Sequence, residues 1–315
     1  MDAITGFIGR ARETELALDA IARGSNVLVT GRPGIGKSAF LRHLAARLRE
    51  QDEMLPVIEV PAGTTKHVLQ ELARQLHACN GLAIPAQQLP PRMLARARQL
   101  GSLGWDDLAR TIRRLSVVDT LDIIVASLRK RRLLVMLESL EVPPSQAELF
   151  TRLIEHAQVV AAMDDNNRRV RIDRLLWRFP ERLVLKPLPL ADCTAIIEPW
   201  LAHQPLRFAS PRTRDRFVRH VATASGGVPA AIRGMLEAAA AEDEITPARA
   251  RAFQHEAAAQ YLDLTPLLIV LLVVFIALRY VSRGIGEVEL LVFSGVATAV
   301  FLGLRMFMYR LRATP

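Results

Sequence analysis

Short apolar runs alternate along the first two thirds of the chain with longer segments whose apolar residues recur every three or four positions. The longer segments have the spacing of helices. The short runs are rich in Val, Leu and Ile, which is typical of buried strands, and they lie at 26–30, 56–61, 132–137, 159–163 and 183–188. Strands that alternate with helices form a parallel sheet with helices packed on both faces. The pattern therefore predicts an α/β domain over residues 1–188.

Beyond residue 188 the chain keeps the helical spacing and loses the strand-like runs. Helices are expected at 189–202, 213–224 and 230–240. The last two are separated by Ser225-Gly226-Gly227-Val228-Pro229, in which the glycines and the proline mark a tight turn. The sequence thus predicts a small helical domain, over residues 189–260, that follows the sheet.

Two uncharged apolar runs occupy the end of the sequence, at 264–278 and 290–304. Each would form a helix of ~22 Å, whereas ~30 Å is needed to cross the hydrocarbon layer of a membrane. An arginine and a tyrosine follow each run, and these can extend a short span because arginine snorkels and tyrosine lies at the interface. We therefore predict a two-helix membrane hairpin with a short cytosolic tail over residues 261–315. A pair of buried helices in a water-soluble domain is the alternative.

Composition limits the choice of partners only weakly. Half of the residues are hydrophobic, and Lys and Arg exceed Asp and Glu by 41 − 32 = 9. The charge forms no dense basic stripe, so the composition does not favour nucleic acid as a partner. The two cysteines, Cys79 and Cys193, match no metal-binding spacing and are expected to be reduced.

The strongest chemical signal follows the first apolar run. It is the pattern G-x4-GK[ST] at residues 31–38, and a helix-forming segment follows it. Glycines let backbone N–H groups close around phosphate groups at the start of a helix. In such a loop Lys37 reaches the β- and γ-phosphates and Ser38 coordinates Mg²⁺. The sequence therefore predicts a loop that binds ATP or GTP, with the binding residues Gly31, Pro33, Gly34, Ile35, Gly36, Lys37, Ser38 and Ala39.

A second part of the same site is expected where the apolar run 132–137 ends. Glu138 follows this run directly, and Glu141 comes shortly after it. A carboxylate at the carboxyl end of a strand, beside a phosphate loop, holds Mg²⁺ directly or through water. We therefore expect Glu138 to be the metal-side acid, together with Ser38.

The opening segment Phe7-Ile8-Gly9-Arg10-Ala11-Arg12-Glu13 lies about twenty residues before the first strand. It resembles the F-[VI]-G-R-x-x-E box of AAA+ ATPases and, more narrowly, of the STAND class of signal-transduction ATPases. In that family the box lies against the adenine. The resemblance implies that Phe7, Ile8 and Gly9 flank the base and that ATP is preferred to GTP. An ordinary helix entry with a solvated Arg10 is the alternative.

The strand that ends in an acid is similar to the STAND version of this site. It has four hydrophobic residues, an acid, a small residue, a hydrophobic residue and a second acid. Glu138 stands where most relatives have Asp, and Ser139 stands where many AAA+ enzymes have their catalytic Glu. The resemblance makes Glu141 the candidate for activating the attacking water. The departures at Glu138 and Ser139 imply slow hydrolysis, as in a switch rather than a motor.

Two segments near the fourth and fifth strands also resemble the family. AAA+ proteins place a polar sensor of the γ-phosphate after the fourth strand, where Asp164 has the wrong charge, so a simple turn is expected. Arg178, followed by Phe179, is similar to the arginine that reaches the nucleotide of a neighbouring subunit. Arg182 is the second candidate for this role, and a surface arginine at the start of the strand is the alternative.

The turn at residues 226–229 resembles the G-G-x-P turn of the AAA+ and STAND lid. This resemblance implies that Gly227 and Pro229 lie near the nucleotide and couple its state to the orientation of the lid. Ala230 and Ala231 stand where many AAA+ proteins carry a sensor arginine. Arg233, one turn later, is only a weak substitute.

These features together predict an α/β P-loop NTPase, a parallel sheet sandwiched by helices, with a small α-helical lid and a C-terminal two-helix membrane hairpin. The resemblance implies an ATP-binding switch or assembly ATPase that forms a homo-oligomer with ATP and Mg²⁺ and hydrolyses ATP slowly. The predicted hairpin would anchor it in a membrane, where it would control the hairpin or an unidentified protein partner. Because the site needs cytosolic ATP, the ATPase domain is expected to face the cytosol at the bacterial inner membrane. Two alternatives stay open, the ATPase of an envelope secretion or pilus machine and a DNA-associated AAA+ protein.

Overall fold

The computed structural model describes residues 7–52, 55–100, 103–129, 133–165, 173–204, 206–242 and 244–253, together with Ala277. The chain divides into two units between residues 259 and 260, and the elements below belong to the first unit. The predicted membrane hairpin lies outside the described residues, apart from Ala277. Within the described part of the chain, no helix is both long and apolar enough to cross a membrane.

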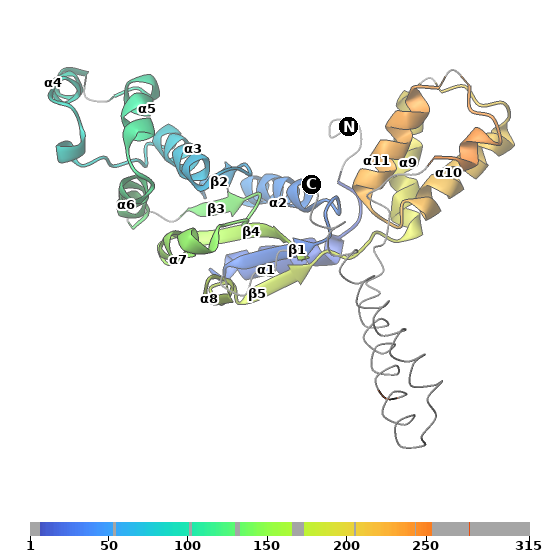
Figure 1. Ribbon diagram of the computed structural model, residues 1–315, viewed down its shortest axis with the longest axis horizontal. Coiled ribbons are helices and arrows are strands. Elements are labelled where there is room, and N and C mark those ends of the chain that lie inside the picture. The colour runs from blue at the N-terminus through green and yellow to red at the C-terminus, as the bar shows by residue number, and fades with distance from the viewer. Residues whose placement is uncertain are drawn as a thin grey trace, which may run out of the picture. The chain divides into compact units, whose positions relative to one another are not determined.

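In the described residues, five parallel strands form one sheet (Figure 1). They are β1 (Val27–Gly31), β2 (Val57–Val60), β3 (Leu134–Leu137), β4 (Gln158–Asp164) and β5 (Glu181–Val184). Their order in space is β2-β3-β4-β1-β5, so β1 lies between β4 and the edge strand β5. Since every pair is parallel, the carboxyl ends of all these strands meet at one edge of the sheet. The predicted α/β architecture is confirmed.

The fifth strand lies earlier in the chain than the apolar pattern predicts. The pattern indicates a strand at 183–188, whereas β5 spans Glu181–Val184. The Leu185 N–H still donates to Thr30 O at 2.8 Å. The chain then leaves the sheet because Pro187 has no N–H for the ladder and because the Leu188 N–H donates to Gly227 O at 2.8 Å. The apolar residues at the end of this run therefore pack at the junction with the next helices.

Side chains of the central strands alternate between two hydrophobic cores. In β1, Val27 and Val29 belong to one core and Leu28 belongs to the other. The same alternation places Val160 and Val159 of β4 in different cores. Successive side chains of a strand point to opposite faces, and helices cover both faces here. This explains why the central strands are apolar throughout rather than alternately polar.

Helices cover the two faces of the sheet (Figure 1). One face is covered by α1 (Ala11–Ala22) and α2 (Lys37–Gln51). The other face is covered by α3 (Thr65–Ala78), α6 (Val117–Leu128), α7 (Ala147–Ile154) and the short α8 (Asp173–Leu176). Between α3 and α6 the chain forms α4 (Pro91–Leu100) and α5 (Trp105–Arg114), of which α5 packs on α3. Short 3₁₀ helices are η1 (Ala86–Gln88), η2 (Pro144–Gln146) and η5 (Arg249–Arg251).

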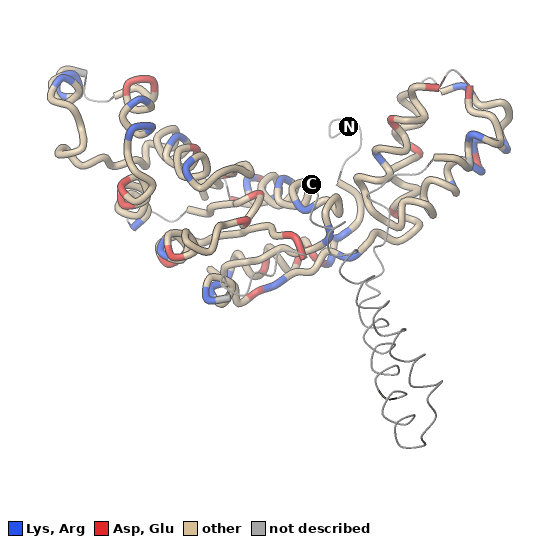
Figure 2. Tube along the Cα trace, in the orientation of Figure 1, with Lys and Arg blue, Asp and Glu red and all other residues tan. Residues whose placement is uncertain are grey.

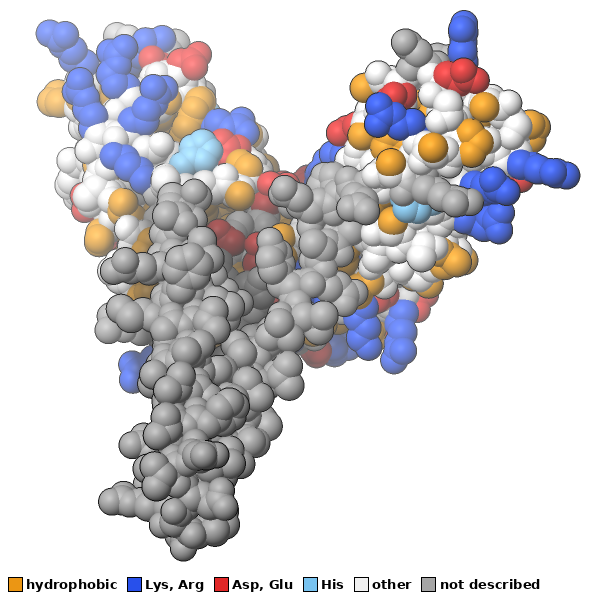
Figure 3. All heavy atoms as spheres, turned by 45° about the vertical axis from the view of Figure 1, so that its right-hand side comes forward, with side chains coloured by type: hydrophobic (Ala, Val, Ile, Leu, Met, Phe, Trp, Pro, Cys, Tyr) orange, Lys and Arg blue, Asp and Glu red, His pale blue; other side chains and the backbone are white. Residues whose placement is uncertain are grey.

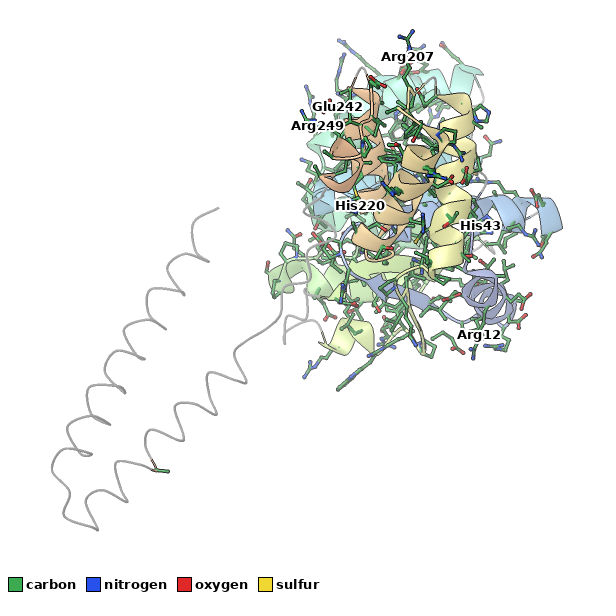
Figure 4. The ribbon with its side chains drawn as sticks, turned by 90° about the vertical axis from the view of Figure 1, so that its right-hand side faces the viewer. Arg12, His43, Arg207, His220, Glu242 and Arg249 are labelled. Atoms are coloured by element: carbon green, nitrogen blue, oxygen red, sulfur yellow. The ribbon has the colours of Figure 1, made fainter. Side chains whose placement is uncertain are left out.

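In the described residues, three α-helices follow β5 in the region predicted to be the lid. They are α9 (Leu190–His203), α10 (Pro211–Ala224) and α11 (Pro229–Ala240), and we refer to them as the lid. Their apolar sides belong to the same core as α1 and α2. Phe217 is fully buried, with its ring centroid 5.6 Å from those of Phe208 and Phe253. Figure 4 shows this part of the lid with His220, whose Nε2 lies 2.9 Å from Phe253 O. The lid is thus a packed helical layer that continues the core of the sheet.

Candidate nucleotide-binding site

The glycine loop connects the end of β1 to the start of α2, at the carboxyl edge of the sheet. Gly36 has a φ of 96°, a left-handed conformation that glycine adopts without strain. It is also the residue before the first turn of α2, which begins at Lys37. The first N–H groups of a helix have no partner within the helix and favour an anion. The loop therefore presents backbone donors at the edge where the strands end.

A cavity of about 600 Å³ opens beside this loop, within the range of ~300–1,000 Å³ that is usual for small-molecule sites. Its walls come from the loop and α2, from the segments at the ends of β3 and β4, and from α11 of the lid. The loop and α2 contribute Pro33, Gly34, Gly36, Lys37, Ser38, Ala39 and Arg42. The strand ends contribute Glu138, Ser139, Glu141, Ala162, Met163 and Asp164, and the lid contributes Pro229, Ala230, Arg233, Gly234 and Glu237.

Lys37 is held by three acceptors inside this cavity. Its Nζ donates to Gly31 O at 3.0 Å and to Arg32 O at 2.8 Å, and it forms an ion pair with the carboxylate of Asp164. Asp164 is the last residue of β4 and lies opposite Gly31 in the parallel ladder. The simple turn expected at Asp164 is therefore wrong, because this residue ends a strand and contacts the loop lysine.

The two predicted acids of the β3 end reach the same cavity. Glu138 follows β3 directly, and its N–H donates to Val60 O at 3.0 Å. The Leu140 N–H donates to Ala162 O at 2.7 Å, which holds the following loop across the end of β4. Glu141 therefore lines the cavity together with Glu138, although it lies beyond the strand.

The cavity contains oxygen ligands of the kind that Mg²⁺ prefers. The Ser38 hydroxyl and the Glu138 carboxylate belong to residues of its lining, whereas the Asp164 carboxylate is paired with Lys37. Among the described residues, no cluster of three or more His, Cys, Asp or Glu side chains could hold a metal ion. Mg²⁺ commonly uses one or two carboxylates and completes its shell with water and phosphate oxygens. The residues therefore fit a magnesium–nucleotide complex rather than a bare ion.

The N-terminal box is attached to the glycine loop through Arg10. The Arg10 side chain is buried, and its Nη2 donates to Ile35 O at 2.8 Å. Burial lowers the pKa of its guanidinium, while the nearby carboxylates Glu13 and Asp192 oppose this effect. The alternative of a solvated Arg10 is wrong, because this side chain ties the box to the loop.

Phe7, Ile8 and Gly9 lie beside the site but do not line the cavity described above. The Phe7 ring stacks on His43 of α2, with a centroid distance of 4.2 Å and an interplanar angle of 13°. Gly9 has a φ of 78°, which favours glycine, and a Cβ there would lie 2.5 Å from Asp192 Oδ2 of α9 and would have to push this side chain aside. The box is thus packed between α2 and the first helix of the lid.

The turn before α11 contacts the glycine loop directly. The Ala230 N–H donates to Gly34 O at 3.2 Å, and a Cβ at Gly36 would lie 3.7 Å from Pro229 Cγ. Gly227 has a φ of 74° and packs on the backbone of Leu188. The lid is therefore linked to the loop at α11 and to the end of β5 at Gly227.

Sequence reasoning gave too little weight to the charged residues of α11. Arg233 and Glu237 line the cavity with Ala230, and Arg233 Nε lies 3.8 Å from Glu237 Oε1. The signal was available in the helical spacing, because residues three and four positions apart share one face of a helix. Once Pro229 is placed at the loop, the same face of α11 brings Arg233 to it.

Arg178 lies at the opposite edge of the sheet from the glycine loop. It precedes β5, and its carbonyl oxygen accepts a hydrogen bond from Asn26 Nδ2, just before β1, at 3.0 Å. Its guanidinium forms an ion pair with Glu155. The second candidate, Arg182, donates from Nη2 to Leu176 O at 3.0 Å. Neither arginine lines the cavity, so the structure does not bring them to the nucleotide site of their own chain.

A parallel sheet whose first strand leads through a glycine loop with Lys37 and Ser38 into a helix defines a P-loop ATPase fold. The chain belongs to the AAA ATPase domain family, whose pattern matches residues 6–163. No curated protein sequence matches the chain.

Solved structures that share this fold include the following three. The ORC2 protein of Aeropyrum pernix in ADPNP and ADP complexes is 16% identical, with a TM-score of 0.51 over 90% of this chain and 77% of that chain. The ORC1 protein of Aeropyrum pernix in complex with DNA is 19% identical, with a TM-score of 0.51 over 78% of this chain and 65% of that chain. The Walker-type ATPase PABY2304 of Pyrococcus abyssi is 12% identical, with a TM-score of 0.50 over 88% of this chain and 76% of that chain. At these identities the likeness concerns the fold alone.

Proposed function

We propose that this protein is a membrane-anchored ATPase of the AAA+ type, similar to the STAND class, in which bound ATP controls the lid and the association of chains. The observation that carries this proposal is the meeting of three elements at one cavity. The glycine loop, the acids after β3 and the first turn of α11 all line it, and Ala230 hydrogen-bonds to Gly34. A ligand in the loop therefore acts on the lid directly.

The residues in and beside the cavity have the following tasks in this proposal. The backbone N–H groups at the start of α2 and the Lys37 ammonium hold the phosphate groups. Ser38 and Glu138 would hold Mg²⁺, which would neutralise the charge that develops on the phosphate oxygens. Glu141 accepts a proton from the attacking water, and Phe7, Ile8 and Gly9 support the side of the site where the base binds. Gly227 and Pro229 transmit the state of the loop to the lid.

Slow turnover and assembly complete the proposal. The serine at position 139 has no carboxylate with which to activate water, so hydrolysis depends on the more distant Glu141. Arg178 acts on the nucleotide of a neighbouring chain, because it lies at the edge of the sheet remote from its own loop. The protein then forms a homo-oligomer with ATP. The predicted hairpin at residues 261–315 anchors the assembly in the bacterial inner membrane, where it acts on the hairpins or on an unidentified protein partner.

Replacing Lys37 tests the nucleotide site. Lys37→Ala in the full-length, detergent-solubilised protein should weaken ATP binding by about 10- to 100-fold, because a charge-assisted hydrogen bond contributes ~1.5–3 kcal/mol. Lys66→Ala, which removes an exposed lysine of α3, is the matched control and should leave the ATP affinity unchanged. Calorimetric titration measures both. Equal ATP affinities of the Lys37→Ala variant and the wild type would exclude the proposed site.

A second candidate is a DNA-associated AAA+ protein, and one surface favours it. The helices α4 and α5 carry exposed arginines, which are Arg92, Arg96, Arg98, Arg110, Arg113 and Arg114. Figure 2 marks these basic positions along both helices, and Figure 3 shows blue side chains gathered at this end of the domain. Arg96 pairs with Asp107 at 3.1 Å. Salt-sensitive binding of duplex DNA, weakened by Arg92→Ala together with Arg98→Ala, would favour this candidate over the membrane switch.

A further inference from the structure

We propose that Asp164 competes with the terminal phosphate of ATP for Lys37, so that the site favours a nucleoside diphosphate over a triphosphate. This inference rests on the proposed function of the cavity as a nucleotide site. It starts from the ion pair between Lys37 Nζ and the Asp164 carboxylate.

The Lys37 ammonium has no donor left for a phosphate group while this ion pair persists. A lysine ammonium has three N–H donors. Two are directed at Gly31 O and Arg32 O, at 3.0 and 2.8 Å, and the third is directed at Asp164. The two carbonyl groups belong to the loop that must surround the phosphates. The carboxylate is therefore the partner that an incoming phosphate displaces.

The position of Asp164 in the sheet keeps it beside the loop. β4 and β1 are neighbouring parallel strands, and their register pairs Asp164 with Gly31. Ladder hydrogen bonds on both strands hold the backbone in place, so the carboxylate can move only by rotation of its side chain. The two side chains are largely shielded, with 12% of Lys37 and 30% of Asp164 exposed. After displacement, the carboxylate would still lie close to the new phosphate group.

The charge of the cavity makes Asp164 an unfavourable neighbour for a third phosphate group. The lining contains three basic residues, Lys37, Arg42 and Arg233, and four acidic residues, Glu138, Glu141, Asp164 and Glu237. Its formal charge is 3 − 4 = −1, and replacing Asp164 by Asn would make it 3 − 3 = 0. A triphosphate whose terminal phosphate reaches Lys37 would bring negative charge next to Asp164, the present partner of this lysine, and like charges at short range repel. The β-phosphate of a diphosphate also reaches Lys37, but a diphosphate lacks the γ-phosphate and so brings less negative charge toward Asp164.

The Asp164→Asn substitution should change the affinity for ATP and leave the affinity for ADP nearly unchanged. In the full-length protein with Mg²⁺, we expect this variant to bind ATP about tenfold more tightly than the wild type, as removal of one repulsive charge implies. Its ADP affinity should stay within about twofold. Asp165→Asn, at the next position of the chain, is the matched control and should change neither affinity. Titration calorimetry with ATP and with ADP gives all these constants.

The ratio of the ATP and ADP affinities decides the outcome. Retained ADP binding shows that the Asp164→Asn site is intact, and an unchanged or lower ATP affinity would then overturn the inference while the proposed function stands. If Asp164→Asn does not fold, Asp164→Ala serves instead, because it also removes the carboxylate. It must raise the ATP affinity relative to the ADP affinity, and an unchanged ratio of the two would again overturn the inference. A wild-type protein that binds neither nucleotide would remove the proposed function and this inference together.

Discussion

Phe7 and His43 show how a residue of the N-terminal box is positioned by its neighbours. The Phe7 ring stacks on the imidazole of His43 and lies 6.1 Å from the ring of Phe40. Burial lowers the pKa of His43, and the positive charge of nearby Arg47 lowers it further. The neutral imidazole can stack on a phenyl ring without the desolvation cost of a charged one. The box is therefore attached to α2, the helix that begins at the phosphate loop.

We expect His43 to titrate below 6.5, the ordinary value for histidine. The unfolded state then binds the proton more readily than the folded state. The contribution of His43 to stability is therefore fully present above about pH 6.5, and it is lost as the pH falls from 6.5 through the lowered pKa of the folded state. Phe7→Ala should expose the imidazole and raise its pKa toward 6.5, whereas Leu16→Ala, which trims an exposed leucine of α1, should not. Titration of the histidine resonances by NMR measures this shift, and a wild-type pKa at or above 6.5 would contradict the prediction.

The turn between α10 and α11 is the element that joins the lid to the ATPase domain. Gly227 O accepts from the Leu188 N–H, and the Ala230 N–H donates to Gly34 O. One short turn thus contacts both the segment that follows β5 and the phosphate loop. A change in the loop must alter these hydrogen bonds or move α11, which carries Arg233 and Glu237 into the cavity.

Gly227→Ala should destabilise the folded protein by about 2–4 kcal/mol. The φ of 74° is strained for alanine, and the new Cβ would overlap the backbone of Leu188 and lie 2.9 Å from Pro187 Cβ. Gly24→Ala is a matched control, because Gly24 has a φ of 77° but a Cβ there meets nothing within 4 Å. It should cost only ~1 kcal/mol. Urea denaturation measures the free energy of unfolding of both variants. Equal losses of stability would show that the contact with Leu188 does not contribute to the destabilisation.

At the scale of the whole molecule, the two edges of the sheet carry different groups of residues. The carboxyl edge carries the cavity, and the amino edge carries Arg178 together with the ion pair of Arg23 and Glu181 at 3.0 Å. One chain cannot bring Arg178 to its own loop, because the length of the strands separates them. A role for Arg178 in hydrolysis therefore requires a second chain, and the predicted hairpin would concentrate such chains in the plane of a membrane.

Arg178→Ala should lower ATP turnover at least about tenfold in the assembled protein and leave the turnover of dilute, dissociated chains unchanged. Arg23→Ala is the control, because it removes another exposed, ion-paired arginine from the same edge. Phosphate release, measured over a series of protein concentrations with the molar mass, tests this dependence. An equal loss at every concentration would indicate that Arg178 acts within its own chain or on its stability.

Local patterns in the sequence were sufficient to predict most of the elements and several of the residues that line the cavity. The glycine loop, Ser38 and Glu138 were found because each depends on its immediate neighbours, an apolar run before it and a turn or helix after it. The order of strands and helices followed from periodicity for the same reason. The end of β5 was misplaced because the apolar run continues past the strand, where Pro187 has no N–H for the ladder and the Leu188 N–H bonds to Gly227, which is remote in sequence.

Only the tertiary structure decided which of these pieces meet. Asp164 contacts Lys37 because β4 lies beside β1 and both strands end together, and no local pattern specifies that neighbour. Arg233 enters the cavity because α11 is attached to the loop through Ala230. Side chains that act together in a site are brought close by strand order and helix packing. The sequence determined the chemistry that each segment carries, and the fold determined which of these groups compete for one lysine.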